Sequence, residues 1–178
     1  MRSGWGSITD SLTRDRWEYS GHLPYIKDAK SFLHDYVSIV SDPHLSYAEH
    51  SKTHPPGYTL FLYGLQQIFG FEYPGMAVVL VLVAGLSVFP IYLFWREFID
   101  RDSLRLSLQM FIFSPGLVLM SATSLETFFL FITWVSLAFC LIGWKRSRVL
   151  SGLGGLAAAI ALFSNFLFLL LAPLFAYI

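Results

Sequence analysis

The chain has 178 residues, of which 55% are hydrophobic and 13% are charged, and its formal net charge is zero. Soluble domains carry about 25% charged residues, so this composition excludes an ordinary soluble domain and predicts an integral membrane protein. The lack of a basic excess excludes the electrostatic footprint of a nucleic-acid-binding protein. The lone cysteine, Cys140, lies in an apolar run and is expected to pack there, since it has no partner for an internal disulfide.

The first 56 residues differ in composition from the rest. They hold six Lys or Arg residues, seven Asp or Glu residues and all five histidines. No run in them reaches the roughly 20 apolar residues that cross a bilayer, so we predict a polar region outside the membrane. Apolar residues recur at spacings of three and four over 28–41, which predicts an amphipathic helix. Such a helix lies along the membrane surface or packs on other protein, and the sequence favours neither.

Residues 57–178 are almost entirely apolar. Their pattern predicts a short helix over 57–70, and then membrane spans over about 76–95, 106–122, 127–144 and 150–178. Pro90 is expected to kink the first of these spans. The predicted fold class is therefore all-α: a polytopic membrane bundle, preceded by an extramembrane region with a helix beside the membrane. We expect a multi-pass protein of the plasma membrane.

Two basic segments separate the spans and orient them. They contain Arg96, Arg101 and Arg105, and then Lys145, Arg146 and Arg148. The positive-inside rule places both segments on the cytoplasmic side, which leaves Glu126 on the outer side. Residues 1–56 are outer if the helix over 57–70 turns back, and cytoplasmic if it crosses. The shortness of that helix favours the outer side.

A polar mouth is predicted where the two regions meet, at Thr53-His54-Pro55-Pro56-Gly57. His50 and His54 are four residues apart, but the double proline disfavours one continuous helix through both, so the spacing does not predict a metal site. Lys52 and protonated histidines stabilise phosphate charge. The alternatives are a solvated loop and a phosphate-binding mouth made by His50, Lys52 and His54.

Three carboxylates are candidates for catalytic work: Asp28, Asp35 and Glu126. A carboxylate acts as a general base when it is held within hydrogen-bonding reach of an acceptor hydroxyl. Each candidate also has a structural interpretation. Asp28 precedes the amphipathic pattern and suits an N-cap, and Glu126 suits the first turn of a helix.

The order of these features resembles a known family. The acidic, aromatic-rich stretch at 25–32 is followed by His54-Pro55-Pro56, a span containing Ser114-Pro115, an outer acid at Glu126 and a basic loop. This order resembles the membrane glycosyltransferases of the GT-C fold, especially the relatives of protein mannosyltransferases and aminoarabinose transferases.

The resemblance implies inverting transfer of a hexose or pentose at the outer membrane face. The donor would be a polyprenyl-phosphate-linked sugar and the acceptor a hydroxyl of a glycan, lipid or protein. It implies that Asp28 is the base, with Asp35 a weaker choice, that His54 lies near the donor phosphate, and that Glu126 stands where many members have Asp. Some members use a divalent metal ion, Mg²⁺ or Mn²⁺.

The chain also departs from the family pattern. No span precedes Asp28, the familiar adjacent acid pair is missing from residues 1–56, and the sequence stops inside an apolar run. We therefore expect the N-terminal part of such an enzyme. The alternatives are a non-catalytic membrane subunit and a transporter fragment. A transporter would place polar residues at mid-depth in several spans, and 76–95 and 127–144 have almost none.

Overall fold

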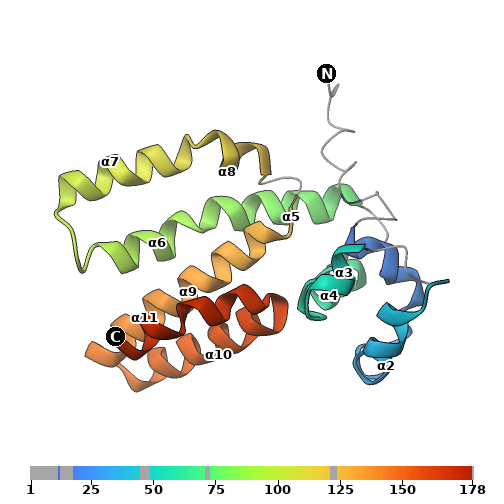
Figure 1. The fold of residues 1–178 in the computed structure, drawn as a ribbon. Coiled ribbons are helices and arrows are strands. Elements are labelled where there is room, and N and C mark those ends of the chain that lie inside the picture. Colours follow the sequence, from blue (N-terminus) through green and yellow to red (C-terminus); the bar gives the residue numbers. More distant parts are fainter. Residues whose placement is uncertain (1–11, 13–17, 45–48, 71–72, 121–123, 178) are drawn as a thin grey trace. The chain divides into compact units, whose positions relative to one another are not determined.

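The computed structural model describes residues 12, 18–44, 49–70, 73–120 and 124–177. Every regular element in these residues is a helix, which confirms the all-α class (Figure 1). The chain divides into two units, at residues 1–79 and 80–178. Each unit is described by itself below.

The described residues of the first unit form four short helices and the start of a fifth. They are η1 (Tyr19–Tyr25), α2 (Ala29–Ser41), α3 (Glu49–Thr53), α4 (Gly57–Phe69) and α5 (Tyr73–Leu86). Helix α2 matches the amphipathic segment predicted over 28–41, with Asp28 as its N-cap. Helix α4 begins after Pro56 and ends at Gly70, whose φ of 65° suits a residue without a Cβ. Its 13 residues extend about 20 Å, less than the roughly 30 Å of a bilayer core.

The core of the first unit lies between α4 and η1. Leu62 and Leu65 of α4 are buried together with Tyr19 and Leu23 of η1. Leu62 and Leu65 lie on one face of α4, because they follow the fully buried Tyr58 by four and seven residues, which is about one and two helical turns. Gly57, Thr59 and Gln66 are buried as well, whereas Gly64 and residues 67–69 are exposed, so the helix has one packed side.

The second unit is a bundle around α9 (Glu126–Arg146). Its other elements are the end of α5, α6 (Val88–Trp95), α7 (Arg101–Ile112), α8 (Pro115–Met120), α10 (Arg148–Ser164), η2 (Phe166–Leu171) and α11 (Ala172–Tyr177). The core is formed by Phe94 with Leu137, Ala138 and Leu141, and Leu171, Leu174 and Phe175 pack against it. After α10 the chain therefore turns back along α9, as Figure 1 shows.

Two helices of the described residues are long and apolar enough to cross a membrane, Tyr73–Trp95 and Glu126–Arg146. The first contains α5 and α6, which are separated at Ser87. Pro90 explains this break, since it offers no N–H to the carbonyl of Leu86 and its ring crowds that carbonyl. At about 31 Å, α9 matches the thickness of a bilayer core.

The segments predicted as spans over 106–122 and 150–178 are not single helices. The first belongs to α7 and α8, which are separated at Phe113 and Ser114. Pro115 disfavours a helical conformation for the residue before it, so α7 ends there. The second is interrupted at Asn165, whose backbone is extended and whose side chain accepts the N–H of Leu167. Residues 121–123 and 178, at the ends of the predicted spans, lie outside the described residues.

The helices α9 and α10 form a close hairpin joined by Ser147 alone. Two glycines allow this approach. A Cβ at Gly143 would lie 2.2 Å from the backbone nitrogen of Ser151, and one at Gly154 would lie 2.6 Å from that of Cys140. The hydroxyl of Ser136 donates to the carbonyl of Gly154 at 3.0 Å. Small residues at such contacts are typical of helices that pack in a membrane.

Candidate functional site

The first unit gathers two histidines and two tyrosines where α3 meets α4. Tyr19 of η1 has its ring centroid 5.8 Å from that of His50, 5.9 Å from that of His54 and 5.0 Å from that of Tyr58. The rings of His54 and Tyr58 lie 5.8 Å apart. We call His50, His54, Tyr19 and Tyr58 the histidine–tyrosine cluster. Sequence analysis predicted the two histidines together, and the structure brings them to one tyrosine.

The ring of His54 is oriented by the helical turn before it. Its Nδ1 lies 3.1 Å from the carbonyl oxygen of His50 and 3.0 Å from the hydroxyl of Thr53. A carbonyl only accepts, so Nδ1 carries the hydrogen and donates it to His50. In the neutral ring Nε2 then has a lone pair, and in the protonated ring it has a second N–H. His54 is therefore a held imidazole that can accept a proton or donate to an anion.

A carboxylate lies beside the other histidine. The Oε2 atom of Glu18 is 3.7 Å from Nδ1 of His50, and the two side chains are 21% and 46% exposed. The pair is an ion pair when His50 is protonated. Glu18 thus opposes the positive charge of this end of the cluster.

Tyr36 fastens α2 to the cluster. Its hydroxyl lies 2.7 Å from the carbonyl oxygens of both Ser51 and His54, and shares its hydrogen between them. Burial raises the pKa of Tyr36 to about 12, so it remains a donor at neutral pH. The contact fixes the backbone at the residue that carries the candidate imidazole.

The N-terminus of α4 lies directly after His54 and has no side-chain cap, because its N-cap is Pro56. Its first N–H groups belong to Gly57, Tyr58 and Thr59, and the start of the helix carries partial positive charge. The hydroxyls of Ser51 and Thr59 are almost fully buried and find no hydrogen-bond partner among the described residues. A buried hydroxyl without a partner costs free energy, so these two side chains do not stabilise this part of the fold through hydrogen bonds.

Asp28 is the N-cap of α2. Ser31 donates its backbone N–H to Oδ1 at 2.9 Å and its hydroxyl to Oδ2 at 2.7 Å. The backbone hydrogen bond from Ser31, followed by its hydroxyl, lowers the pKa of Asp28 below the usual range. The side chain is exposed and ionised at neutral pH. The contacts of Asp28 in the structure are therefore those of a helix N-cap, as the sequence predicts.

The other predicted residues, Asp35, Lys52 and Glu126, are exposed and lie on three different helices. Asp35 lies on α2, where its carboxylate is 2.6 Å from Nδ1 of His34. Lys52 lies on α3 and is exposed. Glu126 is the first residue of α9 in the second unit, exposed, with Ser124 accepting its backbone N–H at 3.3 Å.

A divalent metal does not fit the described residues. No group of three or more His, Cys, Asp or Glu side chains in them is placed to hold a metal ion. Mg²⁺ and Mn²⁺ bind through oxygen ligands, and the carboxylate of Glu18 lies 3.7 Å from Nδ1 of His50.

Sequence analysis missed three residues of this site. Tyr19 and Glu18 precede any clear pattern, since η1 is a 3₁₀ helix without apolar periodicity. Tyr36 falls on the apolar face of the amphipathic pattern over 28–41, and that pattern gives no sign that its hydroxyl reaches the carbonyl of His54. Long-range contacts of this kind have no local signal in a single sequence.

Comparisons of the chain with protein-family models, with curated proteins and with solved structures found no match.

Proposed function

We propose that the chain is part of a multi-pass membrane glycosyltransferase that transfers a sugar from a polyprenyl-phosphate donor to an acceptor hydroxyl at the outer face. The observation that carries the proposal is the position of His54. Its imidazole is oriented by His50 and stands at the uncapped start of α4. A helix N-terminus with neighbouring histidines is suited to a phosphate group.

In the proposed reaction the acceptor hydroxyl attacks the anomeric carbon of the sugar. The bond from that carbon to the phosphate oxygen breaks, the proton passes to a carboxylate, and polyprenyl phosphate leaves. The role of His54, His50 and the first N–H groups of α4 is to stabilise the phosphate as it gains charge. Lys52 lies on the same short helix as His50 and adds positive charge.

Asp28 belongs to the same unit as the cluster, and α2, which it caps, is fastened there by Tyr36, whose hydroxyl donates to the carbonyl of His54. In-line attack places the base and the phosphate on opposite sides of the anomeric carbon, and the proposal assigns these two sides to Asp28 and His54.

The proposal is tested by two substitutions at one position, in membranes supplied with labelled polyprenyl-phosphate sugar. Asn caps a helix about as well as Asp but cannot take up the proton. Asp28→Asn is expected to lower transfer by about 100-fold or more. Asp28→Ala removes both the base and the cap. Normal transfer by Asp28→Asn would exclude Asp28 as the base and leave it as a cap.

Donor binding provides a second test that does not need the acceptor. His54→Gln is expected to weaken binding of polyprenyl phosphate by about tenfold, because a charge-assisted hydrogen bond is lost. His34→Gln is the matched control, since His34 is exposed and faces Asp35. Equal binding by both variants would contradict the phosphate site.

A non-catalytic membrane subunit is the second candidate. The observation that favours it is the engagement of both Asp28 oxygens by Ser31, which a purely structural residue would show. Under this proposal, Asp28→Asn leaves every measured property unchanged, whereas Asp28→Ala destabilises α2.

A further inference from the structure

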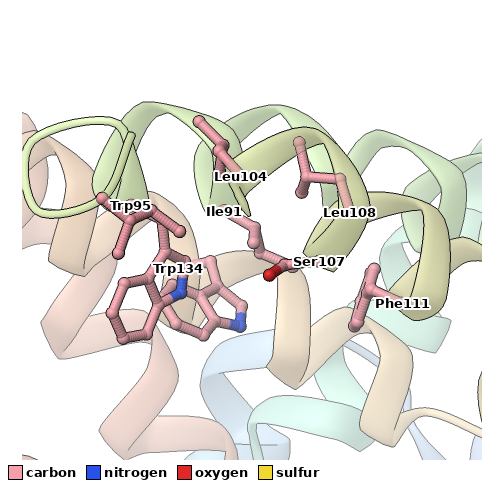
Figure 2. A pocket seen from close by; sticks show the side chains of 8 residues that line it. Ile91, Trp95, Leu104, Ser107, Leu108, Phe111 and Trp134 are labelled. Atoms are coloured by element: carbon pink, nitrogen blue, oxygen red, sulfur yellow. The ribbon is translucent and has the colours of Figure 1, made fainter. Parts of the chain in front are cut away.

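The second unit contains a cavity of about 320 Å³ between α6, α7 and α9 (Figure 2). Its walls are apolar apart from Ser107 and the indole N–H groups. They are formed by Ile91, Trp95, Ile99, Leu104, Ser107, Leu108, Phe111 and Trp134. The rings of Trp95 and Trp134 lie 6.3 Å apart at one end, and Phe111 lies at the other. A volume of this size is at the lower limit of ligand pockets.

The cavity is lined by one face of α7. Leu104, Ser107, Leu108 and Phe111 follow a spacing of three, four and seven residues, which places them on the same side of the helix. Arg101 lies one turn before Leu104 and close to this side, so it marks the end of the cavity near the α6–α7 turn. Asp102 is nearly opposite in helical angle and faces away from the cavity.

Positive charge predominates at that end of the bundle. Residues 96–105 and 145–148 contain six basic and three acidic side chains. Glu97 is already engaged by Lys145 at 3.0 Å, Arg146 at 3.6 Å and Arg96 at 3.7 Å. The carboxylate of Asp100 caps α7 by accepting the N–H groups of Asp102 and Ser103. Arg101 makes no ion pair with another described residue, so its charge is available to an anion.

We propose that this cavity binds one acyl chain of an anionic phospholipid, whose phosphate is held by Arg101. An apolar cavity favours an apolar occupant, and the excess of positive charge at its end favours an anion. A phospholipid of the surrounding bilayer supplies both. Basic pockets between membrane helices are known to bind anionic headgroups in this way. The site lies in the second unit and does not depend on the proposed sugar transfer.

Retained lipid is measured by native mass spectrometry on the whole purified chain. The probes are dioleoyl phosphatidylglycerol and dioleoyl phosphatidylcholine, which share their acyl chains. The unsubstituted protein is expected to retain one phosphatidylglycerol molecule in preference to phosphatidylcholine. Equal retention of the two lipids would overturn the assignment of the headgroup site.

Two pairs of variants locate the lipid. Arg101→Gln is expected to lower phosphatidylglycerol retention about fivefold, and Lys30→Gln, which removes an exposed cation on α2 of the first unit, to leave it unchanged. Ser107→Trp fills the cavity and is expected to lower retention of both lipids at least tenfold. Met110→Trp places the same bulk on an exposed position of α7, 70% accessible, and serves as the control. Unchanged retention by Ser107→Trp, with normal helical content, would overturn the cavity site.

Discussion

Asp28 is a residue to which the sequence attaches two interpretations, and the structure shows one of them, the cap. Its position before an apolar pattern predicted a cap, and the family resemblance predicted a base. The structure gives both oxygens a hydrogen bond from Ser31, which makes the carboxylate a stable anion and a weak proton acceptor. A catalytic role for Asp28 therefore requires that substrate binding loosen the contact with Ser31.

We predict that the stability of the fold decreases at alkaline pH because the hydroxyl of Tyr36 loses its proton. The folded pKa of about 12 is above the usual value of 10, so the folded state favours the protonated form. The associated stabilisation is complete below pH 10 and is lost as pH rises from 10 to 12. Tyr36→Phe is expected to remove this pH dependence and to lower stability at neutral pH by about 1 kcal/mol.

The measurement for Tyr36 is chemical unfolding followed at several pH values. Tyr25→Phe is the control, because Tyr25 is 42% exposed at the end of η1. A transition between pH 10 and 12 that persists in Tyr36→Phe would show that another group causes it.

Among the elements, the α9–α10 hairpin gives a prediction with an internal control. Gly154→Ala is expected to destabilise the bundle by about 1–3 kcal/mol, since the new Cβ meets the backbone of Cys140. Gly155→Ala lies on the same helix, and nothing lies within 4 Å of its new Cβ. It is expected to stabilise the helix by up to about 1 kcal/mol. In detergent, the midpoint temperature of thermal unfolding is expected to fall for Gly154→Ala and to rise for Gly155→Ala, relative to the unsubstituted protein.

The ion pairs of Glu97 connect α6 to the hairpin. Hydrogen bonding from Lys145 lowers the pKa of Glu97 below its usual 4.5, so the stabilisation is present above pH 4.5 and is lost as pH falls below it. Glu97→Gln is expected to cost about 1 kcal/mol at pH 7 and to flatten the stability profile at acidic pH. Asp102→Asn, on the exposed face of α7, is the control. If both variants lose a similar amount of stability as the pH falls below 4.5, Glu97 is not the group that causes the loss.

The sequence predicted where helices occur better than where they are interrupted. Apolar periodicity and length located α2, α4 and α9 to within one or two residues. The interruptions at Ser114 and Asn165 were missed because a hydropathy pattern does not register single backbone groups. A proline removes one N–H and an asparagine supplies one local acceptor, and both act within a continuous apolar run.

For the whole molecule, the four lysines give a test of membrane orientation without any substitution. Lys27, Lys30 and Lys52 lie in the region predicted to be outer, and Lys145 lies in a basic segment predicted to be cytoplasmic. An amine reagent that does not cross membranes is expected to label the first three in intact cells and to label Lys145 only after permeabilisation. Peptide mass spectrometry identifies the sites. Labelling of Lys145 alone in intact cells would reverse the orientation.

The ion pairs at Glu97 bear on this orientation. Charge counting along the chain placed the two basic segments on one side of the membrane, and the structure joins them through Lys145 and Glu97 at 3.0 Å. The histidine–tyrosine cluster could be predicted only in its histidines. Its tyrosines come from η1 and α4, which are brought together by packing that no local pattern encodes.

The packing of the only cysteine has a practical consequence. Cys140 lies within α9 at the position where Gly154 of α10 approaches most closely, and it is half-buried. A thiol reagent therefore meets a partly shielded sulfur, and separation of the two helices exposes the rest of it. Substitutions that loosen the hairpin, such as Gly154→Ala, are expected to raise the rate at which Cys140 is modified.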